Sequence, residues 1–291
     1  MVEADLLRTF AAFAETLNFT HGAKKVGLSQ PAFFERIRRL EESLGAPLYE
    51  KNGRVLSLTP AGTRALAFAR DASTRYADFL AELRQEEPRR RVTLSAGEGA
   101  YLYLLGPALA AFAKTNGDAL ELLTLGGKAV VDALRRGDAD LAVAALDLVP
   151  SSILAHDILT TPLCVAMPEH HPLAKRRTIR VADLAGDRFV LAPEGQLHRD
   201  LVSRALSSRG HAPARVFEAD GWPLMLAFVK AGLGVAFVNG VCDVPRGVVV
   251  RPLPELGSIT YRLLRRRSAN LRPEAEALSA RILALGTRAR V

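Results

Sequence analysis

Apolar residues in the first part of the chain recur with the spacing of short helices. Over 6–17 they repeat every three to four residues, which predicts a first helix. A second short helix is expected over 20–26, with Thr20 as its N-cap and Gly27 as a left-handed stop. A third helix is expected over 29–45. Helices joined by a short turn that contains glycine predict a helix-turn-helix.

A hairpin pattern follows the third predicted helix. Asn52 and Gly53 stand between two short apolar runs, 48–49 and 55–56. An Asn-Gly pair favours a two-residue hairpin turn because both turn positions need positive φ. A hairpin directly after a helix-turn-helix predicts a wing.

A long helix is predicted after the wing. Thr59 and Pro60 cap it, and its apolar pattern continues to about Glu87. Its single apolar seam predicts dimerisation through a second copy of the same helix, and packing on its own domain is the alternative. Pro88 and the three arginines at 89–91 then end the helix and mark a linker. The seam residues expected at the dimer contact are Leu66, Ala69, Tyr76, Phe79, Leu80 and Leu83.

From Val92 the pattern changes to short apolar runs separated by helical patterns. The runs VTLSA, LELLTL, DLAVAAL, LCVAM and RFVLAP have the length of buried strands, and helical spacing returns over 101–114 and 127–136. That alternation predicts an α/β domain with largely parallel sheets. About 200 residues is long for one such layer, so two lobes are expected.

Composition and charge narrow the classes of function. A chain of 291 residues, 49% apolar and 24% charged, fits a folded protein of two or three units and not a disordered one. The net charge is +8, and segment 20–64 holds eight Lys or Arg against four Glu, as phosphate binding requires. The first twenty residues lack a secretory pattern, and no apolar run reaches the roughly 18 residues of a membrane span. The sequence therefore predicts a cytoplasmic protein with an acidic partner and no membrane contact.

Cysteine and histidine usage points away from metal and redox chemistry. Cys164 and Cys242 are far apart in the chain and in no metal-ligand spacing, so both are predicted to be inert core thiols. His170 and His171 also lack ligand spacing. No catalytic residue, metal or cofactor is predicted.

Five segments stand out by their residues and their order along the chain: LLRTFAAFAETLNFTHGAKKVGLSQPA, RIRRLEESLGAPLYEKNGRVLSLTPAG, GDADLAVAA, EHHPLA and VKAGLGVAFV. With them the sequence resembles the LysR-type transcriptional regulators over nearly its whole length. The resemblance implies an N-terminal winged helix-turn-helix, a dimerising linker helix and a two-lobed α/β effector-binding domain like the periplasmic solute-binding proteins. It also implies a homo-oligomer, a dimer through the linker helix and a tetramer beyond it. Such proteins bind an interrupted inverted repeat in double-stranded DNA under control of a small molecule, with RNA polymerase as a further partner.

The resemblance also implies where the domains begin and end. The expected ranges are 1–59 for the winged helix-turn-helix, 60–91 for the linker helix and hinge, and 92–291 for the effector-binding domain, with lobe one over 92–160 and 263–291 and lobe two over 161–262.

The third predicted helix has a core face and an exposed face. At 100° per residue, Phe33, Ile37, Leu40 and Leu44 form the core stripe. In helix-turn-helix proteins the N-terminal part of this helix meets the base edges. The candidates for base contact are therefore Gln30, Pro31, Phe34, Glu35 and Arg38. The candidates for phosphate contact are Thr20, Lys24, Ser29, Lys51 and Arg54.

Phe34 and Glu35 depart from the family pattern, which usually has a small hydroxyl residue and a polar or basic residue there. A phenyl ring can pack on thymine methyl groups, and a carboxylate can accept from cytosine N4. Gln30 suits adenine, and Arg38 suits guanine or a phosphate. Alternatively, Phe34 is a core residue on the flank and Glu35 pairs with Arg38 or Arg39 within the helix.

Three segments are candidates for the effector site because each opens a helix after a strand or a glycine turn. They are GEGAYLY at 97–103, PEGQLHRD at 193–200 and EADGWPLM at 218–225. A helix start favours an anion, so an anionic small molecule is the favoured effector. The family often has Ser or Thr around 99–100 and Pro at the position of Asn239. The candidate effector contacts are Gly99, Ala100, Tyr101, Gln196, His198, Arg199 and Trp222.

Other interpretations of these residues stay open. Trp222 can be a core residue, His198 a surface residue and Arg199 a partner of Glu194. Because Gly99 and Ala100 offer no hydroxyl, a ligand-independent DNA-binding repressor is one alternative function. A two-lobed enzyme with a DNA-binding appendage is another, and it would need a nucleophile or an acid/base pair in the cleft.

Overall fold

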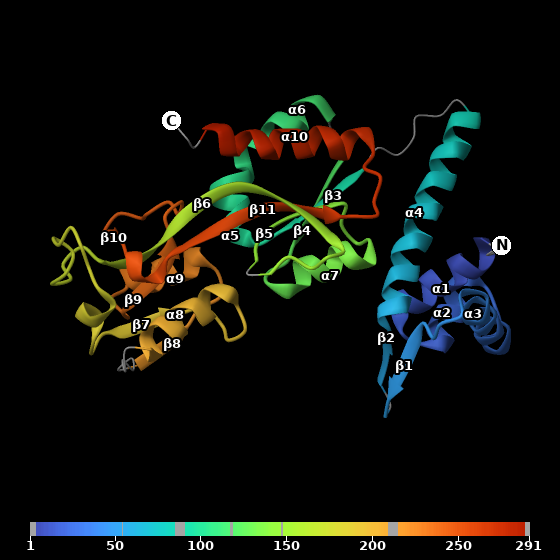
Figure 1. Ribbon diagram of the computed structural model, residues 1–291, viewed down its shortest axis with the longest axis horizontal. Helices are drawn as coiled ribbons and strands as arrows, with labels where there is room; N and C mark the ends of the chain where they lie inside the picture. Colours follow the sequence, from blue (N-terminus) through green and yellow to red (C-terminus); the bar gives the residue numbers. More distant parts are fainter. Residues whose placement is uncertain are drawn as a thin grey trace. The chain divides into compact units, whose positions relative to one another are not determined.

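The computed structural model describes residues 4–53, 55–84, 91–116, 119–146, 148–208 and 215–288 (Figure 1). The chain divides into two compact units: an N-terminal unit of residues 1–90 with 132–139, and a C-terminal unit of residues 91–131 with 140–291. The elements of the N-terminal unit are α1 (Ala4–Thr16), α2 (Phe19–Val26), α3 (Gln30–Leu44), β1 (Tyr49–Asn52), β2 (Val55–Leu58) and α4 (Pro60–Leu83). From Arg91 onward the elements are β3 (Val92–Ala96), α5 (Glu98–Ala100), η1 (Tyr101–Leu105), α6 (Gly106–Asn116), β4 (Leu120–Thr124), α7 (Lys128–Arg136), β5 (Leu141–Ala145), β6 (Ile153–Pro168), η3 (Val181–Leu184), β7 (Arg188–Leu191), α8 (Leu197–Ser207), β8 (Arg215–Glu218), α9 (Trp222–Lys230), β9 (Val235–Asn239), β10 (Val248–Pro252), η4 (Pro254–Leu256), β11 (Ser258–Arg266) and α10 (Pro273–Arg288).

The core of the N-terminal unit confirms most of the predicted stripe on α3. Phe33, Ile37 and Leu40 are almost fully buried and pack in one cluster with Phe10 of α1. Leu44 was predicted in the same stripe, and that prediction is wrong because its side chain is 43% exposed. It is the last residue of α3, where the helix leaves the core.

The start of α2 differs from the prediction by two residues. Asn18 is the N-cap, and its Oδ1 accepts hydrogen bonds from the backbone N–H groups of Thr20 and His21 at 2.9 and 3.0 Å. The prediction of Thr20 as the cap is therefore wrong. Asn and Thr both suit a cap, and here the side chain of Asn18 accepts from the free amides at the start of the helix, one of which belongs to Thr20 itself. The predicted stop at Gly27 is confirmed by its left-handed φ of 70°.

The predicted wing is present, with its turn displaced by one residue. Strands β1 and β2 pair antiparallel, and Asn52 pairs with Val55. The turn therefore begins after Asn52, and the prediction of Asn52 as a turn residue is wrong because Asn52 closes the ladder. Gly53 has the expected positive φ of 64°. Arg54 lies outside the described residues.

The long helix α4 packs on its own unit at one end and is open at the other. The predicted cap is confirmed, since Thr59 Oγ1 accepts from the N–H of Gly62 at 2.9 Å. Leu66 and Ala69 are buried in the core cluster of the N-terminal unit, so the expectation that they form a dimer contact is not supported. Of the other seam residues, Leu80 is half-buried, whereas Tyr76, Phe79 and Leu83 are exposed. The predicted continuation to Glu87 and the linker at 88–90 lie outside the described residues.

The C-terminal unit is built on one path of paired strands. Their order is β4-β3-β5-β11-β6-β9-β7-β8, and β10 also pairs with β6. The expected parallel pairing holds between β3 and both β4 and β5, and between β7 and both β8 and β9. Strands β6, β10 and β11 pair antiparallel. The sheet is therefore mixed, because the chain returns through β11 beside β6.

Two long strands connect the two lobes of this unit. Figure 1 shows β6 and β11 running side by side through both lobes, with α6 and α10 over the sheet of the first. Residues 153–162 of β6 pair with β11, and residues 163–166 pair with β9 of the second lobe. The boundaries expected at 160 and 263 fall inside these two strands.

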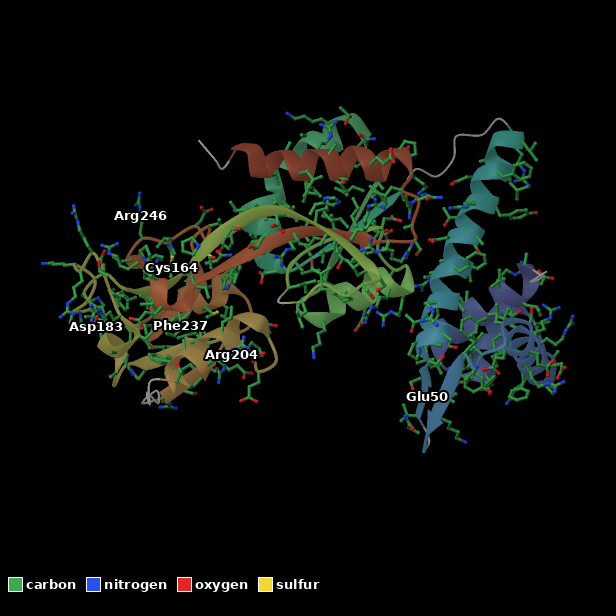
Figure 2. All side chains as sticks on the ribbon, in the orientation of Figure 1. Glu50, Cys164, Asp183, Arg204, Phe237 and Arg246 are labelled. Atoms are coloured by element: carbon green, nitrogen blue, oxygen red, sulfur yellow. The ribbon has the colours of Figure 1, made fainter. Side chains whose placement is uncertain are left out.

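The two cysteines lie in the core of the second lobe. Cys164 and Cys242 belong to one buried cluster, and Figure 2 labels Cys164 within this lobe. Burial raises the pKa of both thiols, that of Cys242 to about 12. The prediction of buried core thiols is confirmed. In the described part of the chain, no helix combines the length and apolar character that a membrane crossing requires.

Candidate DNA-binding surface and effector cavity

The predicted DNA contacts lie on α2, on the N-terminal half and middle of α3 and its cap, and on the wing. The side chains that the structure describes are all exposed: Thr20, Lys24, Ser29, Gln30, Pro31, Phe34, Glu35, Arg38 and Lys51. The hydroxyl of Thr20 donates to Oε1 of Gln30 at 3.2 Å, which joins the two helix starts. Ser29 caps α3 as predicted, because its Oγ accepts from the N–H of Ala32 at 3.4 Å.

Phe34 lies at the edge of the aromatic core and faces solvent at the same time. Its ring centroid is 5.4 Å from that of Phe19, which packs on Phe13 and Tyr49. The Phe34 side chain nevertheless stays 45% exposed. Phe34 is thus held in place by the core while much of its ring remains open to a partner.

Glu35 and Arg38 form the intrahelical pair that was one of the two interpretations. Arg38 Nη2 lies 2.9 Å from Glu35 Oε1, and Arg38 Nη1 lies 3.2 Å from Glu42 Oε1. The hydrogen bond from Arg38 lowers the pKa of Glu35 and raises that of Arg38 itself. A phosphate or guanine must therefore compete with two carboxylates for this guanidinium.

Replacing Phe34 by serine is expected to change DNA sequence preference more than stability. The half-exposed ring contributes about 1 kcal/mol to folding, whereas loss of an apolar contact to thymine methyls would reduce operator affinity about tenfold. Binding to operator and to unrelated DNA, measured by fluorescence anisotropy, tests this. Leu44→Ser is the matched control, since Leu44 is equally exposed at the opposite end of α3. Equal weakening on every DNA with a large loss of melting temperature would place Phe34 in the core instead.

A cavity of about 370 Å³ opens between the two lobes of the C-terminal unit. Its walls come from the loop between β3 and α5, the loop after β4, the end of β5, the turn before α8, the start of α9 and β11. The residues that line it are Gly97, Glu98, Gly99, Ala100, Thr124, Leu125, Gly126, Gly127, Val130, Val143, Ala144, Ala145, Ala192, Gln196, Asp220, Gly221, Trp222, Met225, Ile259 and Tyr261.

The indole of Trp222 lies directly on the backbone of Gly99. A Cβ on Gly99 would be 2.5 Å from Cζ3 of Trp222 and closer still to Cε3. The same indole has its ring centroid 6.4 Å from that of Tyr103. Trp222 thus crosses from the second lobe to the first, and only a residue without a side chain fits beneath it.

A buried polar network holds Tyr261, another residue that lines the cavity. Asn239 Nδ2 donates to the hydroxyl of Tyr261 at 2.8 Å, and Asn239 Oδ1 accepts from the N–H of Val241 and from Sγ of Cys242. Asn239 is 1% exposed and Tyr261 is 6% exposed. Burial raises the pKa of Tyr261, so its hydroxyl stays protonated.

Comparison with known proteins identifies the family. The model of the bacterial regulatory helix-turn-helix protein of the LysR family matches residues 4–63, and that of the LysR substrate binding domain matches residues 85–286. The chain belongs to the LysR family of transcriptional regulators.

Relatives and solved structures agree with this assignment. The transcriptional dual regulator GltC of Bacillus subtilis is 31% identical over 244 residues, 81% of this chain and 80% of its own length. The uncharacterized HTH-type transcriptional regulator YbhD of Escherichia coli is 27% identical over 98% of this chain and 92% of its own length. A variant of full-length OxyR from Pseudomonas aeruginosa has the same fold, with a TM-score of 0.69 and 22% identity over 97% of this chain and 95% of that one.

The structure brings four of the seven predicted effector contacts of this LysR-family chain to the cavity. They are Gly99, Ala100, Gln196 and Trp222. Tyr101 does not line it: its hydroxyl bonds to the carbonyl oxygens of Leu94 and Leu123, which fixes the π-helical turn η1 to the sheet. Burial raises the pKa of Tyr101 to about 12.

Arg199 has a different partner from the one considered in the sequence. Its Nη1 donates to the carbonyl oxygen of Ala192 at 3.4 Å and Arg199 does not itself line the cavity. The side chain of His198 lies outside the described residues.

Several lining residues were missed in the sequence. Glu98, Asp220 and Tyr261 all line the cavity. Glu98 lies in segment 97–103 and Asp220 lies in segment 218–225, and each is close to a predicted contact. Tyr261 carried no local signal, because only the pairing of β11 with β5 and β6 brings it here.

Proposed function

We propose that this LysR-family regulator senses a small molecule held in the cavity between its two lobes. The observation that carries the proposal is the lining of that cavity, to which both lobes contribute. Gly99 and Ala100 come from the first lobe, and Gln196 and Trp222 come from the second. A molecule that touches both lobes has different affinities for different lobe arrangements, and this difference is what lets a ligand shift a protein between states.

The DNA-contacting part of the proposal places the start of α3 in the major groove. Gln30, Phe34 and Glu35 would meet base edges, while Lys24 and Lys51 would approach phosphates. Their exposure and the basic charge of this segment support the assignment. The proposed target is an interrupted inverted repeat in double-stranded DNA.

The assembly part of the proposal rests on the exposed C-terminal half of α4. Tyr76, Phe79 and Leu83 are each more than half exposed. Large apolar side chains gathered along one helix favour burial against a partner, and a second copy of α4 supplies a matching surface. We therefore place the dimer contact toward the C-terminal end of α4, with a tetramer as the assembled state and RNA polymerase as a further partner.

Scattering and footprinting test the proposal together. A metabolite that saturates the fluorescence of Trp222 is expected to change both the small-angle scattering profile and the DNase footprint of the full-length protein on its operator. Sedimentation velocity of the same samples gives the oligomeric state. An unchanged profile and an unchanged footprint with the cavity filled would contradict ligand control.

A further inference from the structure

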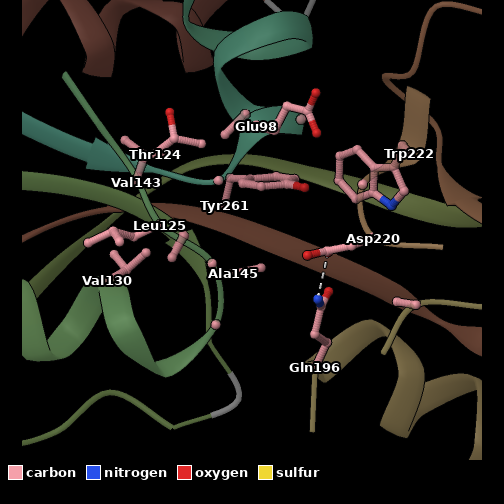
Figure 3. A pocket seen from close by; sticks show the side chains of 18 of the residues that line it. Glu98, Thr124, Leu125, Val130, Val143, Ala145, Gln196, Asp220, Trp222 and Tyr261 are labelled. Atoms are coloured by element: carbon pink, nitrogen blue, oxygen red, sulfur yellow. Dashed lines mark hydrogen bonds between the residues drawn. The ribbon is translucent and has the colours of Figure 1, made fainter. Parts of the chain in front are cut away.

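The effector cavity has one apolar end and one acidic end. Figure 3 shows Leu125, Val130 and Val143 along one side of the space, and Glu98 and Asp220 on the side of Trp222. A ligand that fills the cavity therefore has an apolar part and a polar part at opposite ends.

Glu98 and Asp220 both lie beside the N-terminal end of α9. A Cβ on Gly221, the residue after Asp220, would overlap the Oε2 atom of Glu98. The carboxylate of Glu98 from the first lobe thus lies against the start of α9 in the second. It already supplies the negative charge that this helix start favours, so an anionic ligand there would face a like charge.

The lining residues that the structure describes include no Lys, Arg or His, although the whole chain carries a net charge of +8. Asp220 accepts a hydrogen bond from the neutral amide Nε2 of Gln196 at 2.9 Å (Figure 3). Arg199 bonds to the carbonyl of Ala192 at the rim, and Lys128, which follows the lining residues Gly126 and Gly127, is exposed.

The buried hydroxyl of Tyr261 indicates a second chemical group that the ligand should have. Tyr261 is 6% exposed and lines the cavity, and its oxygen accepts from Asn239. Among the residues that the structure describes, none accepts a hydrogen bond from the hydroxyl of Tyr261. A protonated phenol in such a place calls for an acceptor atom on a bound molecule.

We propose that the effector is a small organic cation, with its charged nitrogen between Glu98 and Asp220 and its apolar part against Leu125, Val130 and Val143. The electron-rich indole of Trp222 beside Asp220 favours the same charge. An acceptor atom on the ligand accepts a hydrogen bond from the hydroxyl of Tyr261. This assignment rests on the proposed function, because it names the class of molecule that the same cavity senses. It replaces the anionic effector expected from the helix starts.

Isosteric probes of different charge test the assignment. One series is 4-methoxybenzamidine, 4-methoxybenzamide and 4-methoxybenzoate, and a second is 5-methoxypentylamine, 5-methoxypentanol and 5-methoxypentanoate; every probe carries an ether oxygen that can accept from Tyr261. Each is titrated into the full-length protein while the fluorescence of Trp222 is followed, since Trp222 is the only tryptophan in the chain. The cations are expected to saturate the signal at concentrations about tenfold lower than their neutral and anionic counterparts.

Charge-neutralising variants then assign the preference to the two acids. The Glu98→Gln, Asp220→Asn double variant keeps the size of both side chains, and the amide oxygen that it introduces at position 220 would still accept from Gln196. It is expected to abolish the tenfold preference for cations. Glu169→Gln is the control, because Glu169 is an exposed acid of the same domain that does not line the cavity.

Three results overturn the assignment: carboxylates that bind as well as the cations, a cation preference that survives in the double variant, or a failure of every cation to saturate. A neutral or anionic compound that saturates Trp222 and shifts the operator footprint would leave ligand control intact and remove only the charge assignment. Ligand control itself fails when compounds fill the cavity and the footprint does not respond.

Discussion

Replacing Gly62 by alanine is expected to destabilise the winged helix-turn-helix strongly and to weaken DNA binding. A Cβ at this position would lie 2.8 Å from the carbonyl carbon of Leu48 and closer still to its oxygen. That oxygen accepts from the N–H of Thr59, and Leu48 is 1% exposed, so the obstacle is fixed backbone and not a movable side chain. Overpacking of this kind costs about 3 kcal/mol of unfolding free energy.

Thermal and urea denaturation, followed by circular dichroism, measure the loss. Gly106→Ala is the matched control, because a Cβ on Gly106 meets nothing within 4 Å and the residue opens α6 with ordinary helical dihedrals. The free energy of unfolding of the control is expected to lie within about 0.5 kcal/mol of that of the natural protein. A Gly62→Ala protein that melts like this control would show that α4 moves away from Leu48 without cost.

Replacing Gly99 by alanine is expected to displace Trp222 and disable the cavity. The added methyl group would occupy the position of the indole carbons Cε3 and Cζ3, so the ring must move into solvent. Tryptophan emission should shift to longer wavelength, and acrylamide quenching should increase. Because Trp222 lines the cavity, ligand affinity should fall about tenfold or more.

The control for this variant comes from the same cavity. Gly126 also lines it, and a Cβ there meets nothing within 4 Å, so Gly126→Ala adds the same methyl group without touching the indole. Its emission spectrum should match that of the natural protein. An unchanged spectrum in Gly99→Ala would mean that the indole does not rest on Gly99 in solution.

Helical periodicity predicted the fold of the N-terminal unit well, because amphipathic spacing decides which face is buried. Phe33, Ile37 and Leu40 follow from it directly. The failures are at ends. Asn18 and Thr20 compete for the same free amides, and Leu44 has core spacing but stands at the last residue of its helix. The local sequence alone does not determine which residue caps a helix or whether its last residue is buried.

The seam of α4 shows a second limit of periodicity. An apolar stripe predicts that one face of a helix is buried, but it does not show whether the same unit or a second chain buries it. Leu66 and Ala69 are covered by their own unit, whereas Tyr76 and Phe79 remain exposed. The dimer contact proposed here is correspondingly shorter than the seam in the sequence.

The effector cavity was predictable in location and not in chemistry. Glycine turns at helix starts pointed to Gly99 and Trp222, and both residues line the cavity. The charge of the lining depends on residues far apart in the chain, such as Glu98 and Asp220, and on a strand pairing that brings in Tyr261. The absent hydroxyl at Gly99 also has a tertiary cause, since the indole of Trp222 occupies the space of a side chain.

The paired strands β6 and β11 limit how the two lobes can move relative to each other. Their ladder runs from Ser258 opposite Pro162 to Arg266 opposite Ile153, so sliding one lobe past the other would break it bond by bond. Bending and twisting keep the ladder intact, and the register shift between Tyr261 and Arg262 is a point where the ribbon already departs from regular pairing. We therefore expect the two lobes to move relative to each other by bending and twisting of the β6–β11 ribbon near Tyr261, which lines the cavity.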